Sequence, residues 1–241
     1  MTRIVALHGF LGQPEDWTGL RDALHELAPR ILFEAIHLPF RSAPGLPMTT
    51  AAWAQEFNRN QHGHRVARNV LIGYSLGARL ALQATLDQPA LWDEVVLVSS
   101  HPGCTEAQER SQRLKADEQW AERFISLPWA DAIEAWNRQT VFAGSREPER
   151  RESDFDKAAL AHVLLNWSPA LDVVPPQALL GLEPKLHWYA GANDTKCIQR
   201  YQRLRSAGLL GEFHAIPDAG HRVIFDRPRE LALQLVVNLN L

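Results

Sequence analysis

The sequence predicts an α/β fold, in which helices flank a mostly parallel sheet and a helical cap is inserted in the core. Short apolar runs alternate with amphipathic segments along most of the chain, and one long stretch holds helical patterns only. A Gly-x-Ser-x-Gly motif also joins one apolar run to a helix-forming segment. Alternation of strands and helices is typical of a parallel sheet with right-handed connections.

Six short runs are predicted to be strands. They are apolar at most successive positions, as expected for parallel strands that helices cover on both faces. The predicted strands are residues 3–7, 31–38, 66–72, 95–99, 186–190 and 212–216. Amphipathic segments predict the core helices, which are residues 17–27, 48–60, 78–88, 198–207 and 228–239.

Residues 102–182 interrupt this alternation. The helical candidates there are residues 107–127, 129–142, 154–167 and 176–182, with a loop predicted at residues 143–148. An all-helical insertion between two strands is most simply a cap over the carboxyl edge of the sheet. We therefore expect residues 1–101 and 183–241 to form the core, and residues 102–182 to form the cap.

Composition argues against several functional classes. The chain has 241 residues and a formal net charge of -3, which gives no indication of nucleic acid binding. No apolar stretch approaches the ~20 residues that span a bilayer, and the first residues lack a signal-peptide pattern. Cys104 and Cys197 form neither a metal site nor a disulfide framework. We expect a cytoplasmic protein with no membrane insertion and no cofactor, whose oligomeric state the sequence does not indicate.

The most informative motif is Gly73-Tyr74-Ser75-Leu76-Gly77. It follows an apolar run and precedes a helix-forming segment, which is the context of a nucleophile elbow. Glycines on both sides of the serine allow strand and helix to approach closely around a strained turn. The start of the helix supplies free backbone N–H groups beside the hydroxyl. Ser75 is therefore the candidate reactive group.

A serine hydroxyl needs a base, and two residues late in the chain are placed to provide one. Asp194 follows the fifth predicted strand and His221 follows the last. Because carboxyl ends of parallel strands share one edge, Ser75, His221 and Asp194 are predicted to meet as a serine–histidine–carboxylate set. The alternative interpretation makes Asp194 a turn residue and His221 a surface residue.

Two backbone N–H groups are candidates for an oxyanion hole. One belongs to Leu76, directly after the serine, and the other to Phe10, in the His-Gly-Phe loop after the first strand. The alternative for that loop is a simple glycine turn with a packed phenylalanine. His8 and His101 are interpreted as polar core residues with satisfied hydrogen bonds.

Cationic residues provide the signal for the kind of substrate. Arg79 lies one helical turn after Ser75 and therefore faces the same side. A buried guanidinium needs compensation, either by a protein carboxylate or by an anionic substrate. Arg110 and Arg113 share one face of a predicted cap helix, although most such residues are solvated.

Together these features resemble the α/β-hydrolase fold, and in detail the 2-succinyl-6-hydroxy-2,4-cyclohexadiene-1-carboxylate synthase family of menaquinone biosynthesis. The matching residues are Leu7-His8-Gly9-Phe10, Gly73-Tyr74-Ser75-Leu76-Gly77 with Arg79, His101-Pro102-Gly103, residues 107–110 through Arg113 to Gln119-Trp120, Val141-Phe142-Ala143 and Ala219-Gly220-His221. The elbow and the histidine loop are shared by the whole superfamily. Arg79 and the cap segment are the specific part.

The resemblance implies a lyase that removes a proton from an anionic cyclohexene and expels pyruvate. By resemblance, Ser75 takes the proton as a base activated by His221, and Asp194 orients the imidazole. The N–H groups of Leu76 and Phe10 would stabilise developing negative charge. The resemblance also implies that a small polycarboxylate substrate binds in a pocket lined by Tyr74, Arg79, Arg113 and Trp136.

Two departures from the family pattern concern the substrate more than the fold. Lys157 stands where the family has a further carboxylate-binding arginine, and lysine keeps the charge but lacks the planar fork. Residues 38–42 replace the Pro-Gly-His-Gly-type loop of many α/β hydrolases, and Arg41 there is either an anion contact or solvated. The alternative functions are a carboxylesterase or C–C bond hydrolase acting on an anionic substrate, and a non-catalytic binding module.

Overall fold

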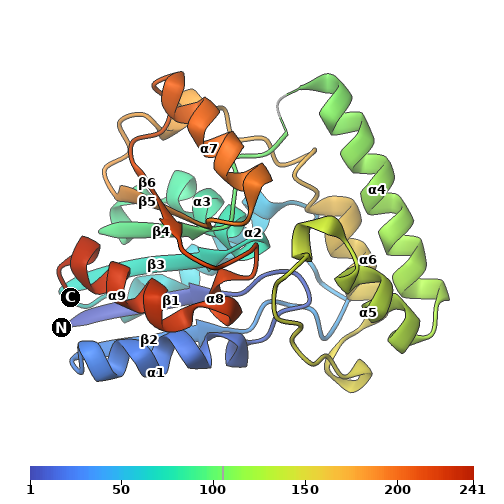
Figure 1. Ribbon diagram of the computed structural model, residues 1–241, viewed down its shortest axis with the longest axis horizontal. Coiled ribbons are helices and arrows are strands. Elements are labelled where there is room, and N and C mark those ends of the chain that lie inside the picture. Colours follow the sequence, from blue (N-terminus) through green and yellow to red (C-terminus); the bar gives the residue numbers. More distant parts are fainter. Residues whose placement is uncertain (105) are drawn as a thin grey trace.

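The computed structural model describes residues 1–104 and 106–241. Its centre is a six-stranded parallel sheet with the order β2-β1-β3-β4-β5-β6 (Figure 1). The strands are β1 (Thr2–Leu7), β2 (Ile31–Ile36), β3 (Arg68–Tyr74), β4 (Glu94–Val98), β5 (Lys185–Gly191) and β6 (Phe213–Ile216). The predicted strands are confirmed, and their ends differ from the observed ones by at most two residues.

The direction in which the chain winds through the sheet reverses between β1 and β3. From β1 the chain winds outward to β2 in one direction and from β3 to β6 in the other. Leu7 pairs with Gly73, so the loops that follow these two strands leave the sheet side by side. In open parallel sheets ligands bind at the carboxyl ends of strands where the winding direction reverses.

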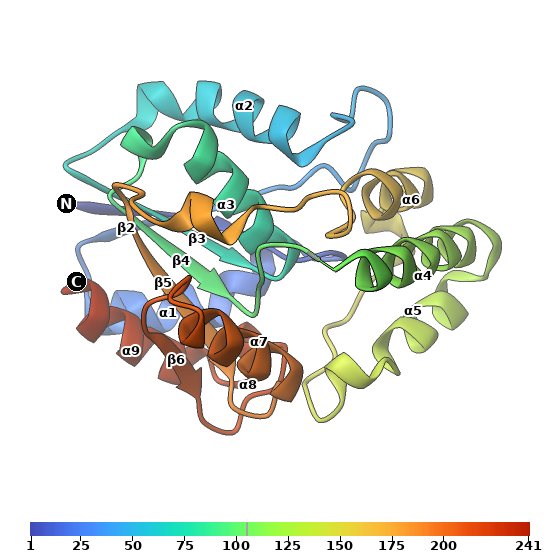
Figure 2. The ribbon, with the colours of Figure 1, turned by 90° about the horizontal axis from the view of Figure 1, so that it is seen from above.

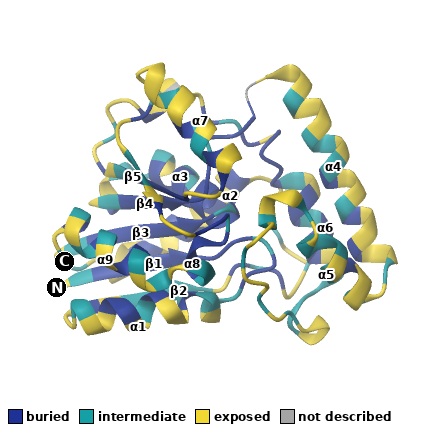
Figure 3. Ribbon diagram, in the orientation of Figure 1, coloured by how far each residue is buried: buried dark blue, intermediate teal, exposed yellow. Residues whose placement is uncertain are grey.

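Helices cover both faces of the sheet (Figure 2). On one face lie α1 (Thr18–Leu27), α8 (Val223–Asp226) and α9 (Pro228–Leu239), and on the other lie α2 (Thr50–Gln61), α3 (Leu76–Asp87) and α7 (Thr195–Ser206). Successive residues of a strand face opposite sides. Ile4 accordingly packs in the core with Leu20 and Leu235, whereas Val5 packs in the core with Phe57 and Leu80. The inner strands β1, β3, β4 and β5 are therefore buried on both faces along most of their length, whereas the edge strands β2 and β6 are only partly buried (Figure 3).

Residues 102–104 and 106–182 are called the cap here, and their helices lie over the carboxyl end of the sheet (Figure 1). The cap contains α4 (Ala107–Ser126), α5 (Trp129–Asn137) and α6 (Lys157–Asn166), and among its described residues there is no strand. α4 packs along α6, and the buried side chains of Ala121 and Phe124 join the core between cap and sheet.

Three predicted helix boundaries were wrong, and a capping group explains one of them. α6 begins at Lys157, not at 154, because the carboxylate of Asp156 accepts the N–H groups of Ala158 and Ala159. The predicted helix 129–142 ends at Asn137 and is followed by a short 3-10 turn, Thr140–Phe142. The predicted helix 176–182 is only the turn Pro176–Leu179, after which Gly181 adopts a φ of 80°.

The described residues, 1–104 and 106–241, offer neither a membrane-spanning helix nor a cluster of metal ligands. None of their helices combines the length and apolarity that crossing a bilayer requires. They contain no group of three or more His, Cys, Asp or Glu side chains placed to hold a metal ion.

Candidate active site

Ser75 occupies a strained turn between β3 and α3. Its φ is 53° and its ψ is -112°, a conformation that non-glycine residues rarely adopt. A Cβ atom at Gly73 would lie 2.3 Å from the carbonyl oxygen of Gly77, and one at Gly77 would lie 2.1 Å from that of Leu7. The two glycines therefore allow β3, α3 and β1 to approach closely enough to hold the serine up at the sheet edge.

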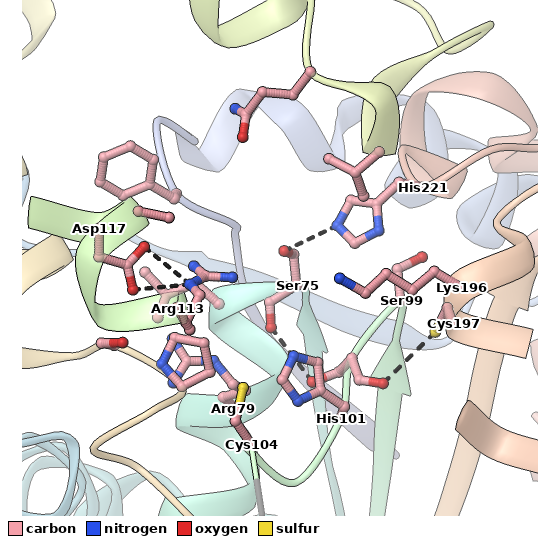
Figure 4. A pocket seen from close by; sticks show the side chains of 18 of the residues that line it. Ser75, Arg79, Ser99, His101, Cys104, Arg113, Asp117, Lys196, Cys197 and His221 are labelled. Carbon is pink, nitrogen blue, oxygen red and sulfur yellow. Dashed lines mark hydrogen bonds and ion pairs between the residues drawn. The ribbon is translucent and has the colours of Figure 1, made fainter. Parts of the chain in front are cut away.

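His221 and Asp194 reach Ser75 from two other strand ends. The Oγ–H of Ser75 donates to Nε2 of His221 across 3.1 Å, and Nδ1–H of His221 donates to Oδ2 of Asp194 across 2.7 Å. The loops after β3, β5 and β6 carry these residues, which sequence reasoning placed at the same edge. Figure 4 shows the imidazole of His221 pointing at the serine hydroxyl.

Asp194 is held in its charged form. Burial opposes ionisation, but hydrogen bonds from His221 and from the N–H of Cys197 outweigh burial, so the pKa of Asp194 lies below its usual value. A carboxylate that is ionised and fixed by two donors selects the imidazole tautomer with a proton on Nδ1. Nε2 of His221 is therefore free to accept the serine proton.

The loop after β1 is braced by a neutral histidine. His8 is buried, and burial lowers its pKa to about 3. Nδ1–H of His8 donates to the carbonyl oxygen of Gly9 at 3.0 Å, and its Nε2 accepts the N–H of Leu38 at 3.1 Å. The interpretation of His8 as a satisfied core residue is confirmed.

The two N–H groups predicted for an oxyanion hole belong to residues that line the cavity beside Ser75. Leu76 is the first residue of α3, so its N–H has no acceptor within the helix. The Phe10 side chain packs against Phe40, Phe124 and Trp136, so the loop contains the packed phenylalanine of the alternative interpretation as well.

A cavity of about 420 Å³ lies between the sheet edge and the cap, with Ser75 and His221 in its wall (Figure 4). Arg79 reaches it from α3, and Arg113 and Trp136 reach it from the cap. The cavity is therefore neither apolar nor uncharged.

Arg79 is already compensated by the protein. Its Nη1 lies 2.9 Å from Oδ2 of Asp172, and its Nη2 donates to the carbonyl oxygen of Trp167 at 2.7 Å. The other carboxylate oxygen of Asp172 accepts the amide of Gln83. Burial lowers the pKa of Arg79 and Asp172 opposes that effect. Of the two forms of compensation that the sequence allowed, a protein carboxylate is therefore present.

Arg113 is only partly neutralised. Its Nε donates to both carboxylate oxygens of buried Asp117, at 2.9 and 2.8 Å. The two terminal nitrogens of Arg113 make no hydrogen bond to a described residue, and its side chain remains 41% exposed. Those nitrogens are therefore available to an anion in the cavity. Arg110, on the same helix, donates instead to the carbonyl oxygen of Ala170.

Two of the residues predicted to line the pocket do not line this cavity. Lys157, at the start of α6, donates to the carbonyl oxygen of Leu127 and pairs with Glu152 at 3.0 Å, which directs it toward the end of α4. Tyr74 is buried on the other side of the elbow and lines a smaller cavity. Arg41 is exposed and lines neither cavity.

Sequence reasoning missed two cations that line the main cavity from α7. Lys196 has no ion pair with a described carboxylate, and Arg200 pairs with Glu109 of α4 at 2.5 Å. Lys196 stands two positions after Asp194, on the first turn of a helix that begins at the reactive edge of the sheet. That spacing is the signal that could have indicated it.

The fold and the hydrogen-bonded set of Ser75, His221 and Asp194 indicate the class of protein. A family model described as "Alpha/beta hydrolase family" matches residues 4–234, so the chain belongs to that family. Within it, the chain is 29% identical over 237 residues to a protein of Escherichia coli O1:K1 named 2-succinyl-6-hydroxy-2,4-cyclohexadiene-1-carboxylate synthase, covering 93% of this chain and 88% of that protein. A protein of the same name from Enterobacter sp. (strain 638) is 29% identical, with 99% and 92% covered.

Solved structures with the same fold include proteins described under different names. MenH from S. aureus superposes with a TM-score of 0.87 at 18% identity, covering 99% of this chain and 93% of that one. A carboxylesterase structure from the thaumarchaeon Nitrososphaera gargenis superposes with a TM-score of 0.77 at 13% identity, covering 99% and 90%. At these identities the likeness shows the fold alone.

Proposed function

We propose that this protein is a carbon–oxygen lyase of menaquinone biosynthesis. It eliminates pyruvate from a polycarboxylate cyclohexene and releases 2-succinyl-6-hydroxy-2,4-cyclohexadiene-1-carboxylate. The observation that carries the proposal is one cavity that joins the Ser75–His221–Asp194 chain to guanidinium groups of the core and the cap. The names of its relatives support it.

In the proposed reaction Ser75 is the base. His221 takes the serine proton on Nε2, and the oxygen so activated removes a proton from a ring carbon of the substrate. The electron pair of that C–H bond forms a new ring double bond as the C–O bond to the three-carbon group breaks. The departing enolate takes up a proton and becomes pyruvate, so the overall step is an elimination without oxidation or reduction.

Electrostatic stabilisation accompanies the proton transfer. Negative charge develops on the substrate when the ring proton leaves, and N–H groups of Leu76 and Phe10 are proposed to stabilise it. The open terminal nitrogens of Arg113 are proposed to bind a substrate carboxylate, since a planar guanidinium matches both carboxylate oxygens. Trp136 supplies apolar surface for the ring.

Arg79 is proposed to act on the substrate by its charge, because Asp172 already occupies one of its terminal nitrogens. Lys157 is proposed to have no direct contact with a substrate bound at Ser75, in contrast to the arginine that the family pattern leads us to expect there. Lys196 is proposed to replace the missing positive charge from the opposite wall.

A coupled pyruvate-release assay with the cyclohexene substrate tests this function. Wild type should release pyruvate and form the cyclohexadiene, and Ser75→Ala should lose on the order of 10³-fold or more in kcat. Arg205→Ala, on the exposed part of α7, serves as the folded control. Absence of pyruvate release by wild type would refute the lyase proposal.

The second candidate is a hydrolase that uses the same three residues. The ion pair between Arg79 and Asp172 favours a hydrolase, because it leaves less positive charge for a substrate to compensate. An ester with fewer carboxylates would fit such a site. In this case Ser75 would attack a carbonyl carbon and form an acyl-enzyme. Rapid turnover of p-nitrophenyl esters with a burst of p-nitrophenol, and no pyruvate from the cyclohexene, would establish the hydrolase.

A further inference from the structure

A second cavity of about 50 Å³ adjoins the elbow on the side away from α7. We call it the side cavity. Residues that line it are Asp16, Tyr74, Arg150, Arg222, Phe225 and the loop at positions 9–12. Phe10, Ser75, Trp136 and Phe142 line both cavities, so the reactive serine stands at the boundary between them.

Arg222 brings a positive charge without an ion pair to the side cavity, and the carboxylates of Glu147 and Asp226 act on it only from beyond ion-pair distance. Only 4% of this residue is exposed, yet none of the described carboxylates lies within ion-pair distance of its guanidinium. It donates to the carbonyl oxygen of Arg146 and to the amide oxygen of Asn137, both uncharged, and it lies 4.0 Å from the Phe142 ring centroid. A buried cation without an anionic partner is costly.

Arg150 and Tyr74 bring unused donors. The Arg150 side chain is 9% exposed, and its Nε is buried with no hydrogen-bond partner among the described residues. One of its terminal nitrogens pairs with Asp16 at 2.7 Å. The Tyr74 hydroxyl makes no hydrogen bond to a described residue. Two guanidiniums against one carboxylate leave the lining with a net positive charge.

The volume suits one functional group and excludes a whole substrate. A cavity of about 50 Å³ accommodates roughly three to five waters, at about 10–15 Å³ for each, which is comparable to the space that a carboxylate takes. An unpaired buried guanidinium, a free Nε and a phenolic hydroxyl are the donors that a carboxylate accepts.

We propose that the side cavity is a carboxylate subsite that holds the carboxylate of the three-carbon leaving group, with Arg150, Arg222 and Tyr74 as its recognition residues. The inference rests on the proposed lyase function. In an enolpyruvyl ether one carbon separates the carboxylate from the breaking C–O bond. A bond that breaks beside Ser75 therefore places this carboxylate at the boundary of the two cavities, and the subsite keeps the leaving group apart from the ring carboxylates bound under the cap.

Product inhibition by pyruvate tests the subsite. In the full-length enzyme turning over the cyclohexene substrate, the inhibition constant for pyruvate should rise roughly tenfold or more in Arg222→Gln and in Arg150→Gln, and a few-fold in Tyr74→Phe. Arg151→Gln, whose guanidinium is exposed and pairs with exposed Glu149, is the matched control and should keep the wild-type constant.

Succinate serves as the second probe, because it mimics the part of the substrate assigned to the main cavity. Its inhibition constant should not change in Arg222→Gln, Arg150→Gln or Tyr74→Phe. If the inhibition constants of pyruvate and succinate rose equally, the arginines would serve only to hold the cap loop, and the subsite would be overturned. Inhibition constants for pyruvate equal to that of wild type would also overturn it. Tyr74→Phe removes only a hydroxyl, so it decides the matter if the arginine variants unfold.

The same assay separates the two levels of inference. Pyruvate release by wild type with unchanged pyruvate inhibition in all three variants overturns the subsite and leaves the lyase intact. No pyruvate release by wild type overturns the lyase and, with it, the assignment of this cavity to its leaving group.

Discussion

Nε2 of His221 lies 3.1 Å from Oγ of Ser75, although 146 positions separate the two residues in the chain. The His221 loop is held in place by Asp226, whose carboxylate accepts the N–H of Gly220 at 2.9 Å and the hydroxyl of Ser145 at 2.8 Å. Ser145 belongs to the cap. The position of the imidazole therefore depends on the cap as well as on the core.

Asp194→Asn should lower turnover far more than substrate affinity. An asparagine keeps the shape but donates where Asp194 accepts, which favours the wrong imidazole tautomer. We expect kcat to fall on the order of 10³- to 10⁴-fold with KM changed little. Steady-state kinetics with the pyruvate-coupled assay measures both constants, and a loss confined to KM would contradict the orienting role of Asp194.

Arg79→Ala should reduce both stability and activity, whereas Arg205→Ala should affect neither. Removing one partner of a buried ion pair typically costs 3–5 kcal/mol, because the other partner, here Asp172, is left buried and unpaired. Urea unfolding and the activity assay together measure the two effects.

The double variant Arg79→Met with Asp172→Leu separates structure from substrate binding. Replacing both charges by apolar groups should restore most of the lost stability. If Arg79 also acts on the anionic substrate, the stable double variant remains poorly active. Recovery of wild-type kcat/KM in this variant would limit Arg79 to a structural role.

Asp117→Asn should strengthen binding of an anionic substrate. Asp117 holds Nε of Arg113 with both carboxylate oxygens, and its charge opposes that of the guanidinium. Removing that charge should lower KM a few-fold, roughly three to ten times. Glu118→Gln, an exposed neighbour on the same helix, provides the control. An unchanged or raised KM would argue against a carboxylate at Arg113.

Gly77→Ala should destabilise the fold. A Cβ atom there would lie 2.1 Å from the carbonyl oxygen of Leu7, so backbone must shift, and overpacking of this kind costs roughly 1–3 kcal/mol or more. Gly63→Ala places its Cβ where no atom lies within 4 Å and should be neutral or slightly stabilising. Thermal melts of both variants check the difference, and equal melting temperatures would be inconsistent with the close approach.

Acid should destabilise the protein through its buried histidines. The pKa of His8 is about 3 in the folded chain and about 6.5 when unfolded, so between these values only the unfolded chain binds the proton. The contribution of neutral His8 to the free energy of unfolding is complete above about pH 6.5. It is lost as pH falls toward 3, by up to about 1.4 kcal/mol per pH unit. His101, whose pKa burial also lowers, adds to this slope.

Urea unfolding at pH 7.5 and 5.5 measures that slope. His8→Gln should lose less stability between the two values than wild type does, roughly 1 kcal/mol less, because residue 8 no longer titrates. An identical pH dependence in both proteins would show that His8 is accessible to protons in the folded state.

Much of the fold was predictable because burial on both faces leaves a direct record in the sequence. Strands with apolar residues at successive positions and helices with one apolar face were recognised almost to their ends. One boundary that failed, the start of α6, depends on a local cap, the carboxylate of Asp156. Propensity averages over a helix, whereas a cap depends on one side chain and its rotamer.

The site divides in the same way. The meeting of Ser75, Asp194 and His221 followed from parallel topology, since the ends of β3, β5 and β6 must share an edge. The pairing of Arg79 with Asp172, 93 positions away, and the direction of Lys157 away from the cavity did not follow from any pattern. Arg222 gave no signal beyond standing next to His221.

The sequence by itself determined the class of fold, the strained serine turn and the edge at which the reactive groups gather, because these depend on periodicity, glycine positions and strand order. Only the tertiary structure decided which charges neutralise one another and which remain open to a ligand. Ion pairing depends on distances of a few ångströms between side chains on separate elements, and burial alone decides whether an unpaired charge is costly.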